Sequence, residues 1–228
     1  MVRNQIIHVS RYAFPDYYRE TMFVKQIANW GEFMRKKIAI TGGIGSGKSL
    51  AAKYVADMGY PVFSCDEINR ELWQNSAYIE KIKALFPACV SNGKVDKNVL
   101  KSIVFNDETA LKKLNETAHP MIMERLYSKM NNCESALIFA EVPLLFEEKY
   151  EDDFDVIIII TRALDKRIQA VQQRDGFSIE EVLKRISAQF DYSTLENRIK
   201  NLTAYVIKND GDEMNLKEKI IAVVSNLK

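Results

Sequence analysis

The stretch IAITGGIGSGKS, residues 38–49, carries the strongest structural signal in this 228-residue sequence. Its first four residues form a short apolar run of strand type, and its last eight satisfy the pattern G-x-x-x-x-G-K-[ST]. Apolar residues at helical spacing follow over residues 48–58, and Gly59 ends the pattern. A buried strand, a glycine-rich turn and a helix in this order predict a phosphate-binding loop, or P-loop.

The residue types of this loop fit the binding of a nucleoside triphosphate. Glycines let the backbone turn tightly and point its N–H groups at phosphates, and the helix N-terminus adds partial positive charge. Lys48 is expected to reach the β- and γ-phosphates, and the Ser49 hydroxyl to ligate Mg²⁺. The candidate nucleotide-binding residues are Gly42, Gly43, Ile44, Gly45, Ser46, Gly47, Lys48 and Ser49. A glycine turn with a chance lysine is the alternative, and the flanking strand and helix argue against it.

The rest of the chain alternates strand-like and helical segments. Further strand-like runs occupy residues 61–64, 136–142, 155–161 and 205–208, and helical patterns occupy 164–174, 178–190 and 215–227. This alternation predicts an α/β fold with a doubly wound, five-stranded parallel sheet. Roughly seventy residues separate the second and third runs, far more than one crossover helix needs. Helical patterns at 67–73, 77–86, 97–105, 108–117 and 120–130 therefore predict a helical subdomain inserted into the sheet.

Composition and charge argue against several functional classes. Lys and Arg total 32 and Asp and Glu 31, so a net charge of +1 provides no general attraction for nucleic acid. The three cysteines lack C-x-x-C spacing, which favours a reducing compartment over a disulfide framework or a zinc site. Since no apolar run approaches ~20 residues and residues 1–35 lack a signal-peptide core, we expect a cytoplasmic protein without a membrane partner.

The first 33 residues differ from the rest, because aromatic and charged side chains mix there without a clear period. Two interpretations fit. Met34 is the true translation start and residues 1–33 are an upstream extension, or these residues form an ordered N-terminal helix.

Asp66 is the candidate catalytic base, because it directly follows the second predicted strand, beside the P-loop strand. A kinase needs a group there to accept the proton of the acceptor hydroxyl. The alternative is that Asp66 only caps a helix beginning at Glu67. A GTPase would need a guanine-reading N-K-x-D segment, which the sequence lacks.

The later motifs resemble, in kind and in order, those of the dephospho-coenzyme A kinase family. After the P-loop, its D-A-D-x-x-x-R, V-P-L-L-x-E, R-I-x-x-Q and V-I-x-N-x-G segments correspond to SCDEINR (64–70), VPLLFE (142–147), RISAQ (185–189) and VIKNDG (206–211). A His-Pro pair at 119–120 and an Arg-Asp pair at 174–175 complete the set. The resemblance covers residues 35–227.

This resemblance implies an ATP-dependent kinase that phosphorylates the ribose 3′-hydroxyl of dephospho-CoA, the last step of coenzyme A biosynthesis. It implies ATP and Mg²⁺ as co-substrate and cofactor, and a monomer or small homo-oligomer. Asp66 would be the base, and Arg174 a lid arginine that stabilises the transferring phosphoryl group. The acceptor would contact Asp66, Arg70, Pro143, Leu144 and Glu147. Asn209, just after the fifth strand, would contact the adenine of ATP.

The resemblance also divides the chain. Residues 1–34 would be an extension and 35–228 the kinase domain. Its core would comprise 35–66, 133–163 and 200–228, with the acceptor-binding insertion at 67–132 and a helical lid at 164–199. We expect Pro120 to open a helix and His119 to have a structural role there.

The sequence departs from the family pattern at three places. Ser64 replaces the first aspartate of D-A-D, and Thr203, Ala204 and Tyr205 replace the residues before V-I-x-N. Ala170 replaces an arginine four residues before Arg174. Two interpretations fit: Arg167, one turn further back, substitutes for it, or Arg174 acts alone. Two rival functions remain: a nucleoside or nucleotide kinase, and an ATP-gated binding protein that phosphorylates no small molecule.

Overall fold

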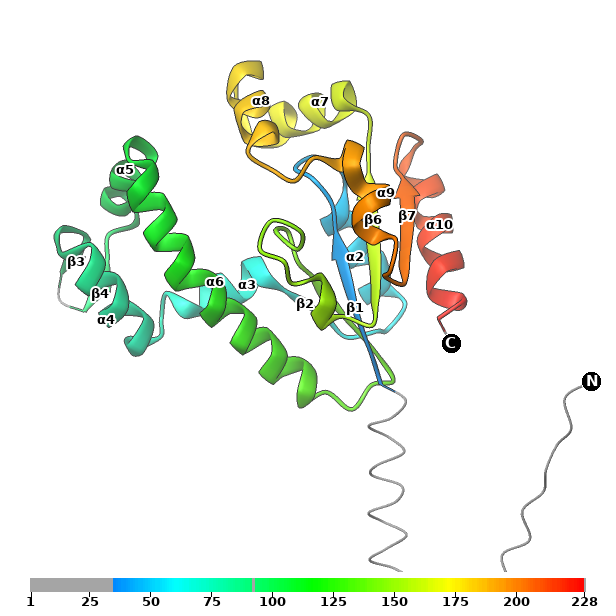
Figure 1. Ribbon diagram of the computed structural model, residues 1–228, viewed down its shortest axis with the longest axis horizontal. Helices are drawn as coiled ribbons and strands as arrows, with labels where there is room; N and C mark the ends of the chain where they lie inside the picture. Colours follow the sequence, from blue (N-terminus) through cyan, green and yellow to red (C-terminus); the bar gives the residue numbers. More distant parts are fainter. Residues whose placement is uncertain (1–34, 92, 228) are drawn as a thin grey trace, which may run out of the picture. The chain divides into compact units, whose positions relative to one another are not determined.

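The computed structural model describes residues 35–91 and 93–227. The N-terminal extension predicted at residues 1–34, with both interpretations of it, lies outside this range. Five parallel strands form the central sheet (Figure 1) in the order β2-β5-β1-β6-β7. They are β1 (Lys36–Thr41), β2 (Val62–Ser64), β5 (Leu137–Glu141), β6 (Val156–Thr161) and β7 (Ala204–Lys208). The predicted doubly wound five-stranded sheet is confirmed.

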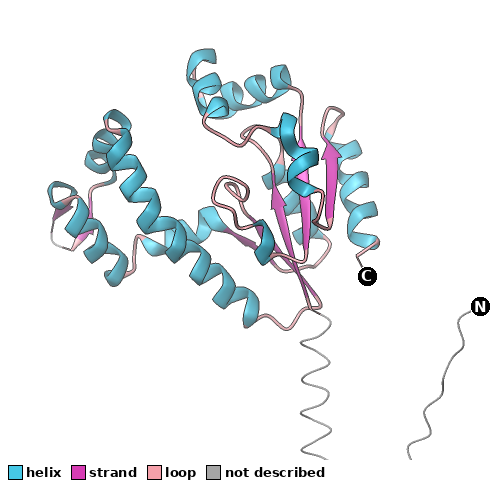
Figure 2. Cartoon of the chain, viewed as in Figure 1, coloured by secondary structure: helices cyan, strands magenta, loops and turns pink. Residues whose placement is uncertain are grey.

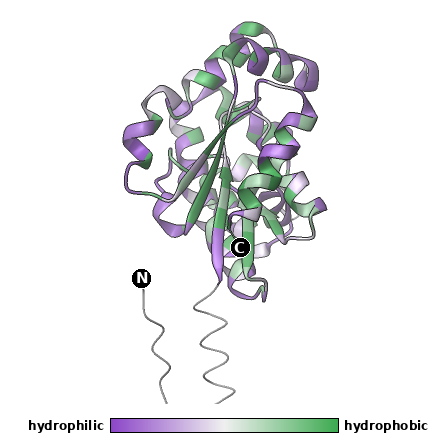
Figure 3. Ribbon diagram, turned by 90° about the vertical axis from the view of Figure 1, so that its right-hand side faces the viewer, coloured by the Kyte–Doolittle hydropathy of each residue, from purple (hydrophilic) through white to green (hydrophobic). Residues whose placement is uncertain are grey.

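The sheet separates two apolar clusters, because successive residues of a strand point to opposite faces. Ile38, Ile40 and Ile158 pack on one face against α2 (Lys48–Asp57) and α10 (Glu213–Ser225). Ala39 and Ile157 belong to the cluster on the other face, which includes residues of α3 (Cys65–Leu72) and α6 (Glu108–Asn131). Strands covered on both faces are almost entirely apolar, as Figure 3 shows for the centre of the sheet.

The long interval between β2 and β5 is a helical insertion, as predicted. It contains α3, α4 (Ser76–Leu85), the 3₁₀ turn η1 (Pro87–Cys89), α5 (Lys97–Asn106) and α6. A small antiparallel hairpin, β3 (Val90–Ser91) with β4 (Lys94–Val95), was not predicted.

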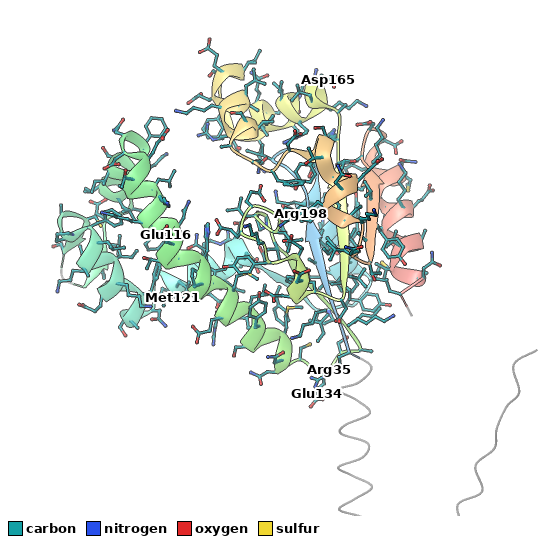
Figure 4. All side chains as sticks on the ribbon, in the orientation of Figure 1. Arg35, Glu116, Met121, Glu134, Asp165 and Arg198 are labelled. Carbon is teal, nitrogen blue, oxygen red and sulfur yellow. The ribbon has the colours of Figure 1, made fainter. Side chains whose placement is uncertain are left out.

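The predicted boundary at His119-Pro120 is wrong, because α6 runs without a break from Glu108 to Asn131. Figure 2 shows one continuous helix, and Glu116 and Met121, labelled in Figure 4, lie on either side of Pro120. Proline opens helices well, but inside a helix it removes only one backbone bond and adds local crowding. The packing of Ala118, Ile122 and Met123 in the apolar cluster outweighs this loss.

The segment after β6 forms the region predicted as a lid. It comprises α7 (Leu164–Asp175), α8 (Ile179–Ser187), the 3₁₀ turn η3 (Tyr192–Thr194) and α9 (Leu195–Ile199). A capping box between Ser178 and Glu181 begins α8, within the helical pattern predicted at 178–190. Figure 1 places α7 and α8 beyond the end of the sheet at which β1 and β6 finish. Within the described residues, no helix combines the length and apolar character needed to cross a bilayer.

Candidate active site

The P-loop connects β1 to α2 at the carboxyl edge of the sheet, where ligands bind in open α/β folds. Gly47 has φ 99°, and a Cβ there would lie 2.4 Å from the Asn209 side-chain nitrogen. A Cβ on Gly43 would lie 2.4 Å from a guanidinium nitrogen of Arg167. The left-handed φ favours glycine at position 47, and at Gly43 the Arg167 side chain packs directly on the loop backbone.

Lys48 is the first residue of α2, and its ammonium group interacts electrostatically with four charged residues of the site. Burial lowers the pKa of its amine, while the negative charges of Glu141 and Asp66 act in the opposite direction. The positive charges of Arg174 and Arg167 lower this pKa further. Residues from three separate segments, β5, α3 and α7, therefore act on one ammonium group, as expected where the charge of several phosphates must be balanced.

The Ser49 hydroxyl donates a 2.5 Å hydrogen bond to Oε1 of Glu141, the last residue of β5. Glu141 is buried, with 6% of its surface exposed. A hydroxyl and a carboxylate side by side after a P-loop are the two protein ligands that Mg²⁺ commonly takes, the remainder being phosphate and water. The described residues hold no cluster of three or more His, Cys, Asp or Glu able to bind a metal ion. The pair therefore suits Mg²⁺ arriving with a nucleotide rather than a tightly held structural metal.

Asp66 lies in the first turn of α3, but it is not the helix cap. The helix begins at Cys65 with Ser64 as its N-cap residue, so the predicted capping alternative at Glu67 is wrong. The Asp66 side chain lines a cavity of about 250 Å³. Next to it, Cys65 is buried, and desolvation raises the pKa of its thiol to about 12.

The cavity lies between the inserted helices and the loop after β5. Pro143 and Leu144 line it, as do aromatic and polar side chains from α3, α4 and α6. His119 also lines it, and its Nδ1 lies 2.9 Å from Oε1 of Glu148. His119 is thus part of the cavity wall, where the sequence suggested a helix corner.

Two residues predicted to bind the acceptor are not among the residues that line the cavity. Arg70 is largely exposed, and its guanidinium lies 3.6 Å from the Glu67 carboxylate. Glu147 instead accepts a 2.9 Å hydrogen bond from the Phe190 backbone N–H. Pro143 and Leu144 are therefore at the cavity, whereas Arg70 and Glu147 lie beside it in this conformation.

Arg174 lies in the last turn of α7 and forms a two-point ion pair with Asp175, at 2.8 and 2.7 Å. This pair raises the pKa of Arg174 above its ordinary value, and Asp66 contributes to the shift. Arg174 thus has an exposed ion-pair partner and also acts on the charges of the site. Arg167 is directed at the P-loop and donates from Nε to the Ile44 carbonyl at 2.9 Å.

Asn209 is buried just after β7, and its Nδ2 donates to the Ser46 carbonyl at 2.8 Å. Its backbone N–H donates to the Thr161 carbonyl. The amide nitrogen is therefore engaged in holding the P-loop, and contact with adenine stays a prediction that concerns the rest of the residue and its loop.

A family model described as dephospho-CoA kinase matches residues 36–215, which include the P-loop, the cavity-lining segments and the loop of Asn209. The chain belongs to the dephospho-CoA kinase family.

Relatives in this family are similar over nearly their whole length. The dephospho-CoA kinase of Thermus thermophilus is 35% identical over 190 residues, which cover 83% of this chain and 91% of that protein. The enzyme of Geobacillus kaustophilus is 30% identical over 197 residues, covering 84% and 96%. A crystal structure of a Thermus thermophilus protein superposes with a TM-score of 0.71 at 35% identity, covering 85% of this chain and 98% of that one.

More distant structures support the fold alone. A dephospho-CoA kinase from Campylobacter jejuni has a TM-score of 0.58 at 23% identity, covering 86% of this chain and 98% of that one. A shikimate kinase from Acinetobacter baumannii has a TM-score of 0.52 at 16% identity, covering 85% and 95%. The P-loop kinase fold is thereby confirmed.

Sequence reasoning missed Glu141 and the contact role of Gln189 in this member of the dephospho-CoA kinase family. Glu141 could have been found, because a carboxylate that ends a strand beside the P-loop strand faces the bound metal in many P-loop enzymes. Gln189 was quoted only as part of a motif. Nothing in its sequence position shows that its side chain contacts the P-loop.

Proposed function

We propose that this chain transfers the γ-phosphoryl group of ATP to the ribose 3′-hydroxyl of dephospho-CoA, giving coenzyme A and ADP. This reaction is the last step of coenzyme A biosynthesis. The observation that carries the proposal is that Asp66 lines a cavity large enough for part of a nucleotide and acts electrostatically on the P-loop lysine. Family membership agrees with this arrangement.

Each residue of the site would have a separate role in phosphoryl transfer. Asp66 would orient the acceptor hydroxyl and accept its proton, and Lys48 would neutralise charge on the β- and γ-phosphates. Arg174 would leave Asp175 and turn towards the transferring group, where arginines stabilise developing charge. The loop amides of residues 42–49 would hold the donor phosphates. Catalysis would then consist mainly of positioning and charge neutralisation.

Ser49 and Glu141 would hold Mg²⁺ through the serine hydroxyl and one carboxylate oxygen. When bound, the ion would supply positive charge that offsets the negative charge of the phosphates. The short hydrogen bond between the two side chains keeps their oxygens together at the end of β5.

The acceptor would enter between the inserted helices and the loop after β5. Pro143 and Leu144 would form one wall with Asp66 at the reacting end, while Arg70 would meet the substrate by exchanging its contact with Glu67. We also propose the division into core, insertion and lid given above, a cytoplasmic location, and a monomeric or small homo-oligomeric state.

The proposal is tested by coupled ADP release with dephospho-CoA set against nucleosides, nucleotides and shikimate at matched concentrations. Turnover with dephospho-CoA at a kcat/KM at least about 10³-fold above every other acceptor is expected, since site-specific hydrogen bonding to the correct acceptor discriminates to that degree. Comparable turnover of a nucleoside would support the rival kinase. ATP binding with no transfer to any acceptor would support the ATP-gated binding protein.

A further inference from the structure

Gln189, at the end of the segment after α8, contacts the tip of the P-loop with its side chain. Its Oε1 accepts a 2.7 Å hydrogen bond from the Ile44 backbone N–H and a 3.3 Å bond from Nη2 of Arg167. Arg167 donates in turn from Nε to the Ile44 carbonyl at 2.9 Å. Both backbone polar groups of Ile44 are therefore held by side chains that come from the lid region.

These contacts are close and partly buried. A Cβ on Gly43 would lie 2.4 Å from Arg167 Nη2 and 3.3 Å from Gln189 Oε1, so the two side chains pack directly on the loop backbone. Arg167 is partly buried, and this burial lowers the pKa of its guanidinium. A guanidinium in such a place is stable only where its donors have partners, and here these are Ile44 and Gln189.

The next residue along the chain, Phe190, contacts the loop that lines the acceptor cavity. The Phe190 N–H donates to Oε1 of Glu147, in the loop whose Pro143 and Leu144 line the acceptor cavity. The Phe190 ring packs on Phe146, with ring centroids 4.9 Å apart. The other carboxylate oxygen of Glu147 is buried and has no hydrogen-bond partner in the part of the chain that the structure describes.

We propose that Gln189 is a positioning residue that holds the P-loop in its nucleotide-binding shape, and that its link through Phe190 to Glu147 couples the donor site to the acceptor site. The identity of the two substrates rests on the proposed function. Since residues 189 and 190 are adjacent, a shift of the acceptor-lining loop moves the side chain that holds Ile44. The coupling is reciprocal: a change at Glu147 alters ATP binding although Glu147 lies outside the P-loop.

The test compares Gln189→Met, which keeps the length of the side chain but removes its acceptor oxygen, with Gln173→Met on the exposed side of α7. ATP dissociation constants are measured by calorimetry in the absence of dephospho-CoA, and melting temperatures are recorded for each variant. Gln189→Met should weaken ATP binding about tenfold, because a loop that is no longer pre-organised must be ordered on binding, whereas Gln173→Met should match wild type. A lower melting temperature with unchanged ATP affinity would assign Gln189 a merely structural role and overturn the proposal.

The coupling is tested with Glu147→Met, its exposed control Glu196→Met, and the double variant Gln189→Met/Glu147→Met. Glu147→Met should weaken ATP binding severalfold, and the double variant should bind ATP within about threefold of Gln189→Met, because both changes break one link. Fully additive effects, or no effect of Glu147→Met on ATP affinity, would overturn the link. Because ATP binding is measured without an acceptor, failure of the dephospho-CoA assignment would appear separately, as lack of turnover in the wild-type protein.

Discussion

Replacement of Asp66 by Asn should reduce turnover strongly while leaving the fold intact. Asn has the same shape but cannot accept a proton, and a positioned general base contributes about 10²–10⁴-fold. This range corresponds to about 2.7–5.4 kcal/mol in the activation free energy. Asp66 lies in the first turn of α3, so loss of its charge weakens a helix-dipole interaction by at most about 1 kcal/mol. The melting temperature should therefore fall by no more than about 4 °C.

Glu67→Gln provides the matched control, because it removes the same charge from the same helical turn. Glu67 is exposed and its contact is with Arg70 at 3.6 Å. Steady-state kinetics with dephospho-CoA should give near wild-type kcat for Glu67→Gln and a loss of at least about 10²-fold for Asp66→Asn. ATP affinity should not weaken in either variant, because Lys48 and the loop amides bind the donor phosphates. A folded Asp66→Asn protein with kcat within threefold of wild type would refute the assignment of the base.

Three other substitutions and one deletion extend these tests. Arg174→Ala should reduce kcat by about 10³–10⁵-fold with little change in ATP affinity, and a change of only a few-fold would leave it as a surface partner of Asp175. Glu141→Gln should raise the Mg²⁺ concentration needed for half-maximal activity by about 10–100-fold, and an unchanged requirement in a Mg²⁺ titration would exclude it as a metal ligand. Asn209→Ala should lower the free energy of unfolding by about 1–3 kcal/mol and raise the KM for ATP, because the buried Ser46 carbonyl loses its donor; an unchanged KM would limit Asn209 to a turn. Deletion of residues 1–33 should leave folding and activity intact, since every motif follows Met34, and a large drop in melting temperature would show that the segment belongs to the core.

Local patterns predicted the sheet well because each of its strands is marked by short-range chemistry. Residues 155–161 are apolar on both faces, which is typical of a central parallel strand, and they form β6 between β1 and β7. The P-loop was equally clear, because its glycines are required by backbone geometry that only a few sequences permit. The error at Pro120 arose where local preference and tertiary packing disagree, and packing determined the outcome.

The contacts of the site were much harder to predict, because they join residues far apart in the sequence. Gln189 meets Ile44 across 145 positions, and Glu141 meets Ser49 across 92. A motif can indicate that such residues are important, but not which atoms they contact. For the same reason, the sequence did not show that Oε1 of Glu147 accepts a hydrogen bond from the Phe190 backbone N–H, and the contact of Glu147 with the acceptor stays a prediction.

The central claim is that the transferred phosphoryl group ends on the 3′-hydroxyl of dephospho-CoA. The most direct measurement is identification of the product by ³¹P NMR and mass spectrometry, with 3′-deoxy-dephospho-CoA as the matched substrate analogue. The account predicts a single new phosphomonoester at the 3′-position, formed in equal amount with ADP, and no transfer to the 3′-deoxy analogue. Phosphorylation at the 2′-hydroxyl, transfer to the analogue, or ADP release without a phosphorylated product would contradict it.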